Sequence, residues 1–207
     1  IIPAIATTTA AVTGLALLEF FKVLQDKPVS SLRNGMIDLG GNVYTLFDRD
    51  PPIQNKTYTE KSYMAEKDYT YRKKVIREPN GFTKFDKIVV DVPKGMTTVE
   101  FCDQLLSQVN SGRADDLPQY DIMAVGAGVG SIYNGIPSHS NGKRAILDVI
   151  EDQMIAEGRA KAKGEFFAKR KIYSELTVNL DIEDEELDNM EIDELDVQIP
   201  TVVMRLL

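Results

Sequence analysis

The longest apolar stretch of the chain lies at its start, where no charged residue occurs before Glu19. After the threonines at positions 7–9, any of which can cap a helix, small and large apolar residues continue to Leu24. Apolar residues on all sides are typical of a helix buried in a larger body. The pattern therefore predicts a helix over residues 7–24 that needs a further surface to cover it.

The next segments alternate between ordered and irregular patterns. Residues 36–47 have the pattern of two short strands around Gly40 and Gly41. Residues 51–80 hold Pro51, Pro52 and many charges with interspersed tyrosines, and they predict a linker or an extended surface segment. We therefore expect a domain boundary near Asn80 and Gly81.

The remainder of the chain has clear periodicity. Alternating apolar positions predict strands over residues 85–92, 121–129, 131–135, 171–182 and 197–207. Helical spacing predicts one helix that is capped by Thr97 or Thr98 and runs through Val109, and another over 143–160. This order of elements favours an α+β fold, a small mixed sheet with helices on one face.

The charge of the chain is concentrated in one segment. Ten of its 32 acidic residues lie between Asp181 and Asp196 with no basic residue among them. The rest of the chain carries 22 acidic and 24 basic residues and is close to neutral. An acidic run repels phosphate, so nucleic acid is not expected as a partner.

Few residues are suited to catalysis or metal binding. The chain has one cysteine, Cys102, and one histidine, His139. No internal disulfide is possible, which fits a reducing compartment, and the usual zinc patterns are absent. Glu100 and Asp103 flank Cys102 and would raise its pKa, so we interpret it as a structural thiol. His139 lies in a Ser/Asn/Gly segment and is interpreted as a solvated loop residue.

The glycine-rich segment at 125–131 (VGAGVGS) is similar to a dinucleotide-binding fingerprint. Such a motif needs a helix directly after the glycines, whereas Gly135 and Pro137 interrupt the following residues. We therefore expect a strand–turn–strand with close packing. A phosphate-binding loop in a self-contained nucleotide enzyme is the alternative.

The acidic run at 181–196 (DIEDEELDNMEIDELD) has two main interpretations. It is either a solvated loop between strands or a docking surface, in which the acids steer a basic partner and the interleaved apolar residues supply contact area. Calcium binding would require a glycine turn that the run lacks. A basic cluster could neutralise the run within the domain; it comprises Arg159, Lys161, Lys163, Lys169, Arg170 and Lys171.

Residues 1–24 closely resemble a stretch near the end of the adenylation domain of ubiquitin-activating enzymes, and Arg33, Asn34 and Gly35 resemble its continuation into strands. Later segments are similar to the ubiquitin-fold domain of that family, in the family's order: 81–90 (GFTKFDKIVV), 95–97 (GMT), 128–133 (GVGSIY) and 197–205 (VQIPTVVMR). The family usually has tryptophan where this chain has Phe85, and residues 53–80 are not covered.

The resemblance implies an intact enzyme that adenylates the C-terminus of ubiquitin with ATP and magnesium. That enzyme forms a thioester on its own cysteine and passes ubiquitin to a conjugating enzyme. The nucleotide-binding glycines and the catalytic cysteine would lie upstream of Ile1, and Cys102 does not match the catalytic position. We therefore expect no catalytic, cofactor-binding or metal-binding residue in this chain, and no activity of the fragment alone.

The resemblance divides the chain into the end of an adenylation domain (1–50), a linker (51–80) and a ubiquitin-like domain of β-grasp type (81–207). In this family the ubiquitin-fold domain recruits conjugating enzymes, whose first helix is typically basic, so the acidic run is the expected docking surface. The expected partner-binding residues are Glu183, Asp184, Glu185, Glu186, Asp188, Glu191, Asp193, Glu194 and Asp196.

The resemblance further implies that ubiquitin is bound through the intact enzyme and that the protein acts in the cytoplasm and nucleus. A membrane is not expected as a partner, because Pro3, Gly14 and several threonines interrupt the apolar start of the chain. The alternatives are an activating enzyme for another ubiquitin-like modifier and a scaffold domain with no recruitment role. The triple threonine favours ubiquitin.

Overall fold

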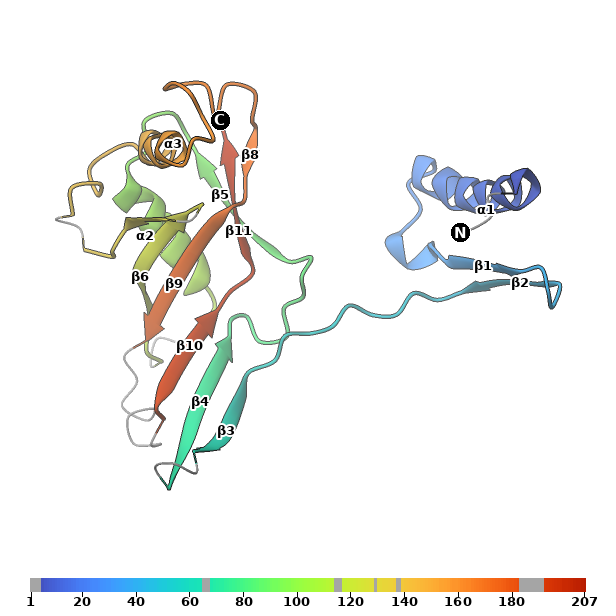
Figure 1. Cartoon of the computed structure of the whole chain (residues 1–207), viewed down its shortest axis with the longest axis horizontal. Helices are drawn as coiled ribbons and strands as arrows, with labels where there is room; N and C mark the ends of the chain where they lie inside the picture. Colours follow the sequence, from blue (N-terminus) through green and yellow to red (C-terminus); the bar gives the residue numbers. More distant parts are fainter. Residues whose placement is uncertain (1–4, 65–67, 114–116, 129, 137–138, 183–191) are drawn as a thin grey trace. The chain divides into compact units, whose positions relative to one another are not determined.

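The computed structural model describes residues 5–64, 68–113, 117–128, 130–136, 139–182 and 192–207. The chain divides into two compact units, Ile1–Pro52 and Ile53–Leu207 (Figure 1). It contains helices together with antiparallel and parallel strands, and it is therefore an α+β protein.

The first unit is a helix packed on a hairpin. Helix α1 (Ala6–Leu24) confirms the helix predicted over 7–24, and strands β1 (Asn34–Asp38) and β2 (Val43–Phe47) confirm the predicted pair. A single 3₁₀ turn (Val29–Ser31) lies between the helix and the hairpin. In the hairpin turn, the Asp38 carboxylate accepts the backbone N–H groups of Gly40 and Gly41 at 2.9 and 3.2 Å.

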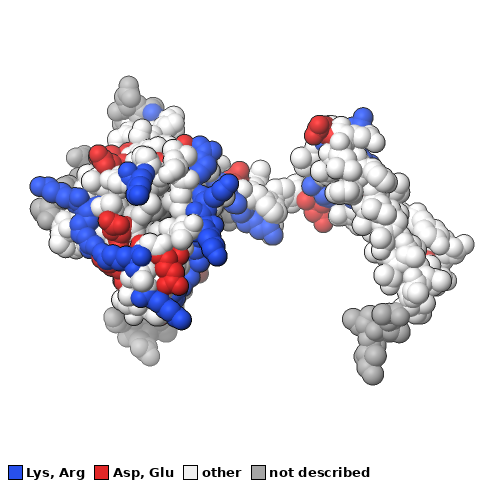
Figure 2. Space-filling view, turned by 90° about the horizontal axis from the view of Figure 1, so that it is seen from above, with Lys and Arg blue, Asp and Glu red and all other residues white. Residues whose placement is uncertain are grey.

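Helix α1 turns its charged residues toward the segment that leads into β1. Glu19 Oε2 accepts the backbone N–H of Arg33 at 2.9 Å, and Lys22 Nζ donates to Glu19 Oε1 and to the backbone oxygen of Ser31. The bond from Lys22, followed by that from Arg33, lowers the pKa of Glu19. The remaining sides of α1 carry no charged residue and are largely exposed (Figure 2). No described residue of this unit is buried.

The composition of α1 also meets the criteria for a membrane-spanning helix. It has 19 residues with a mean hydropathy of 1.3 in its most apolar window. The core helices of soluble proteins pass the same test of length and composition. This finding therefore does not choose between a lipid and a protein environment for the helix.

The second unit contains two sheets and two helices. Six strands follow in the order β3-β4-β10-β9-β6-β7, and three more in the order β5-β11-β8. The larger sheet consists of β3 (Tyr58–Met64), β4 (Tyr69–Arg77), β6 (Tyr120–Ala127), β7 (Gly130–Tyr133), β9 (Leu176–Ile182) and β10 (Glu194–Gln198). The smaller sheet consists of β5 (Lys87–Val92), β8 (Ile172–Tyr173) and β11 (Thr201–Leu206). The two helices are α2 (Thr98–Val109) and α3 (Ile146–Ala156).

Two long segments run side by side through both sheets. Strand β10 pairs in parallel with β4, and after Ile199 and Pro200 the same segment continues as β11, which pairs in parallel with β5. Between the two pairs, the backbone N–H of Glu78 donates to the oxygen of Gln198 at 2.9 Å. The two sheets are therefore joined along one seam.

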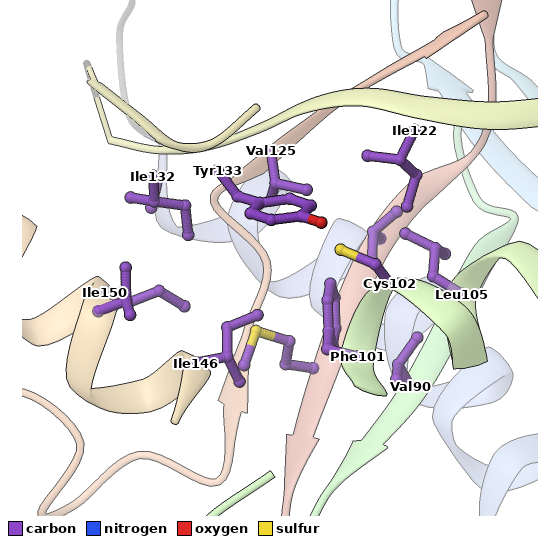
Figure 3. Close-up of a cluster of buried hydrophobic side chains, with 14 of the residues drawn as sticks. Val90, Phe101, Cys102, Leu105, Ile122, Val125, Ile132, Tyr133, Ile146 and Ile150 are labelled. Atoms are coloured by element: carbon purple, nitrogen blue, oxygen red, sulfur yellow. The ribbon is translucent and has the colours of Figure 1, made fainter. Parts of the chain in front are cut away.

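The core lies between the helices and the inner faces of these sheets (Figure 3). Helix α2 contributes Phe101 and Leu105, which are fully buried, and α3 contributes Ile146 and Ile150. They meet strand residues such as Val125, which is also fully buried. This apolar contact fixes which face of the large sheet points outward.

Some predicted elements are divided differently in the structure. The segment predicted as one strand over 171–182 forms β8 and β9, which belong to different sheets, and the segment 197–207 contributes to both β10 and β11. Pro200 has no backbone N–H to donate, so a ladder is interrupted at this residue. The alternating pattern predicts the extended conformation of both segments but not the break within each of them.

The expected linker over 51–80 holds two strands of the large sheet. Strand β3 pairs with β4, and β4 pairs with β10, so these residues belong to the second unit. The structure divides the chain between Pro52 and Ile53 rather than near Asn80 and Gly81. Charged and tyrosine side chains occupy both faces of β3 and β4, so these strands lack the apolar alternation that marks a half-buried strand.

Helix α2 begins with the cap that the sequence predicts. Thr97 accepts the backbone N–H of Glu100 at 3.3 Å, and Glu100 accepts the backbone N–H of Thr97 at 2.8 Å. The bonds from the Thr97 backbone and then from its hydroxyl lower the pKa of Glu100. This reciprocal pair satisfies two N–H groups that the helix leaves free.

We predict that Thr97→Ala lowers the free energy of unfolding by about 1 kcal/mol in urea titrations followed by circular dichroism. Because the pKa of Glu100 is lower in the folded state, its contribution is present above the unfolded value of 4.5 and is lost as pH falls through the folded value. The difference between Thr97→Ala and wild type should therefore shrink in acid. Ser107→Ala, at an exposed position of α2, is the control. An equal loss in both variants would contradict the capping role.

Candidate functional site

The predicted docking residues lie around the start of β10. Of the nine, Glu183, Asp184, Glu185, Glu186, Asp188 and Glu191 lie outside the described residues. Asp193, Glu194 and Asp196 are described: Asp193 directly precedes β10, and the other two belong to it. Asp193 and Glu194 are exposed, and Asp196 is half-buried.

Two of these carboxylates, those of Asp193 and Glu194, contact the neighbouring strand β4. Asp193 exchanges hydrogen bonds with the Arg72 backbone, accepting its N–H at 2.6 Å and donating its own N–H to the Arg72 oxygen at 2.9 Å. Glu194 forms an ion pair with Lys73 and accepts the hydroxyl of Tyr71. The bond to Lys73, followed by that to Tyr71, lowers the pKa of Glu194.

Strand register places further acids on the same face. Val197 of β10 pairs with Leu180 of β9 on the buried side of the sheet, so Asp196 and Asp181 are neighbours on the outer side. Asp181 in turn pairs directly with Asp121 of β6. These three aspartates form a continuous line across three strands, which we call the acidic row.

The acidic row lies on the solvent side of the large sheet. Along β9, Thr177, Asn179 and Asp181 are exposed, whereas Leu180 and Ile182 are buried in the core. Opposed residues in a sheet are separated by roughly 5 Å, so their carboxylates repel each other. A cationic surface laid on this face would meet several carboxylates at once.

The strand register shows which charged residues are neighbours on this face, and the sequence pattern does not. Asp181 belongs to the acidic run, but Asp121 is 60 residues earlier in the chain and lies outside that run. Lys73 and Tyr71 lie in the segment that was expected to be a linker. Only the pairing of β4, β10, β9 and β6 brings them together.

The basic cluster is at the opposite end of β9 from the acidic run. Its ion pairs are local: Arg159 binds Glu175 at 2.5 Å and Glu157 at 3.8 Å, and Lys163 binds Asp152 at 3.0 Å. Five residues of β9, 176–180, lie between Glu175 and Asp181, the first acid of the run, which are therefore about 20 Å apart along the strand. Figure 2 looks onto the end that carries α3 and β8, where Lys and Arg are numerous. These ion pairs therefore do not neutralise the described acids of the run.

The glycine-rich segment confirms the predicted strand–turn–strand. Strands β6 and β7 form an antiparallel hairpin, with Ala127 opposite Gly130. A Cβ atom on Gly130 would lie 2.3 Å from Gln153 Nε2, and one on Gly128 would lie 2.5 Å from Glu157 Oε2. Helix α3 thus occupies the space in front of the glycines, and the hairpin does not fit a phosphate-binding loop.

Cys102 and His139 take part in packing. Cys102 is buried beside Tyr133 (Figure 3), and burial, with a smaller effect from Asp103, raises the pKa of its thiol to about 12. This confirms the structural thiol. His139 is half-buried rather than solvated: its ring contacts Tyr133 edge-on at 5.9 Å, and its Nδ1 accepts the backbone N–H of Asn141 at 3.2 Å.

The described parts of the chain bring no three His, Cys, Asp or Glu side chains together in a way that could hold a metal ion. The acidic row is a line rather than a cluster around one point.

Neither a protein-family model nor a curated protein matches this chain.

We predict that Asp181→Asn stabilises the second unit by a few tenths of a kcal/mol, because it removes a charge from between two others of the same sign. The gain should be measured by urea unfolding and should shrink at high salt, which screens the repulsion. Asp103→Asn, on the exposed side of α2, is the matched control and should change stability less. Destabilisation by Asp181→Asn at low salt would show that the aspartates are not in repulsive contact.

Proposed function

We propose that this chain is the C-terminal region of a ubiquitin-activating enzyme and that its second unit recruits ubiquitin-conjugating enzymes. The acidic row carries this proposal. It places two exposed aspartates, Asp121 and Asp181, beside the half-buried Asp196 on the outer side of the sheet, and it extends the acidic run whose charge suggests a basic partner. Complementary charge of this kind raises the rate of association and fixes the orientation of the bound partner.

In the first unit no residue from 5 to 52 is buried, and this supports its assignment as the end of an adenylation domain. Leu17, Leu18, Phe20 and Phe21 of α1 are all about half-exposed. The free edges of the β1–β2 hairpin are unsuited to a lipid interior, where backbone groups have no partners. A larger protein domain around α1 and the hairpin would cover both features.

Strand pairing in the second unit is compatible with a ubiquitin-like domain of β-grasp type. Strand β5 leads into α2 and pairs in parallel with the terminal strand β11, and α2 packs against the sheets. In this proposal the recruiting domain includes residues 53–80 as well as 81–207, because β3 and β4 are strands of its large sheet.

The proposed enzyme needs ATP and magnesium, but the described residues of this chain do not fit either group. The glycines at 126, 128 and 130 belong to a hairpin against which α3 packs, and Cys102 is a buried thiol with a raised pKa. We therefore assign nucleotide chemistry and thioester formation to other parts of the intact enzyme, and we propose that this chain alone is inactive.

We predict that the full 207-residue chain binds ubiquitin-conjugating enzymes and that binding weakens between about 0.05 and 0.5 M salt, where screening increases strongly. Asp121→Lys combined with Asp181→Lys should weaken binding by at least about tenfold in calorimetry or interferometry, because it places like charges at the interface. The pair Asp50→Lys and Asp103→Lys changes net charge equally at exposed positions outside the acidic row and is the matched control.

Binding measured with conjugating enzymes of ubiquitin and of other ubiquitin-like modifiers distinguishes the alternative functions. Binding to conjugating enzymes of ubiquitin supports the proposal, and a preference for those of another ubiquitin-like modifier would reassign the parent enzyme. Absence of binding to every conjugating enzyme at low salt would exclude recruitment by this chain and favour a scaffold. Equal weakening in both lysine pairs would show that net charge, rather than the acidic row, governs binding.

A further inference from the structure

Lys73 lies between acidic residues of the two neighbouring strands on the proposed docking face. It forms an ion pair with Glu194 of β10 and pairs across the other strand boundary with Glu60 of β3. Asp196, two residues after Glu194, also attracts it. The Lys73 side chain is 30% exposed and that of Glu194 is 46% exposed, so a partner can reach both.

The register places these groups on the same side of the sheet as the acidic row. Glu194 and Asp196 alternate with the buried Val197, and Lys73 is directly opposite Glu194. Glu60 shares this side because it is opposite Lys73. Lys73 therefore lies beside Glu194, Asp196 and Glu60, and its own strand also carries Val75 and Arg77 on this side.

Glu194 is already occupied in the free protein. One carboxylate oxygen accepts Lys73 Nζ and the other accepts the Tyr71 hydroxyl. A basic partner that binds Glu194 must displace Lys73 or share the carboxylate with it. Breaking the existing ion pair costs free energy, so the net free energy of binding is less favourable.

We propose that Lys73 is an intramolecular competitor that limits the affinity of the acidic surface for the basic helix of a conjugating enzyme. The inference rests on the proposed function and adds a residue that opposes recruitment, positioned within a surface that favours it. Exposed ion pairs are individually weak, so the competition changes affinity by a modest factor and leaves binding readily reversible.

The test compares Lys73→Met with Lys61→Met in the full chain. Lys61 is exposed on β3, one residue from Glu60, and it faces the opposite side of the sheet because it pairs with Arg72. Both variants remove one positive charge from the same pair of strands. Circular dichroism should show that both are folded, and Lys73→Gln provides a second variant at the test position.

We expect Lys73→Met to tighten binding of a conjugating enzyme by about threefold to fivefold, the factor that corresponds to one exposed ion pair. Lys61→Met should leave binding nearly unchanged. The carboxyl carbon signal of Glu194, followed by NMR, should shift on addition of the enzyme, and its pKa should be higher in free Lys73→Met than in free wild type. An equal effect of both variants, or none at Lys73, would overturn the inference.

A lysine octapeptide, used as a second probe, distinguishes failure of this inference from failure of the proposed function. If conjugating enzymes do not bind but the peptide binds Lys73→Met more tightly than wild type, competition by Lys73 stands and recruitment is excluded. If conjugating enzymes bind wild type and Lys73→Met equally, recruitment stands and the competitor role is excluded.

Discussion

The parallel pairing of two distant segments is the constraint on which the second unit depends. Strand β4 pairs in parallel with β10, and β5 pairs in parallel with β11. The elements from α2 to β9 therefore connect the first strands of these two parallel pairs to the second ones. Parallel strands cannot be joined by a tight turn, and the connection must pack back onto the sheets. Helices α2 and α3 do so through Phe101, Leu105, Ile146 and Ile150, and the core and the outward face both follow from this arrangement.

The same constraint explains which elements the sequence could predict. Helix α2 and the β6–β7 hairpin depend on neighbours in sequence, on Thr97 and Glu100 for the cap and on close glycines for the turn, and both were predicted. Strand β4 depends on β10, about 120 residues later, and β3 depends on β4. Their charged side chains carry no periodic signal, so residues 51–80 had the pattern of a linker.

The candidate site was predictable to a similar degree. Local charge density identifies the acidic run, but the predicted strand begins only at Val197, whereas in the structure Glu194 and Asp196 already belong to β10. The part of the surface formed by Asp121 and Lys73 could not be predicted, because cross-strand register is a property of the folded sheet. The family resemblance suggests a partner of opposite charge, but it does not predict that Asp121 and Lys73 lie on the same face as the acidic run.

The two faces of the large sheet have opposite energetic roles. On the inner face, Leu180, Ile122 and Val125 bury apolar area against the helices, and this burial stabilises the fold. On the outer face, opposed aspartates destabilise it, and Lys73 relieves part of that repulsion at one edge. A sheet held by its inner face can retain repulsive charges on its outer face. A cationic partner would then gain both its own attraction to the acids and relief of their mutual repulsion.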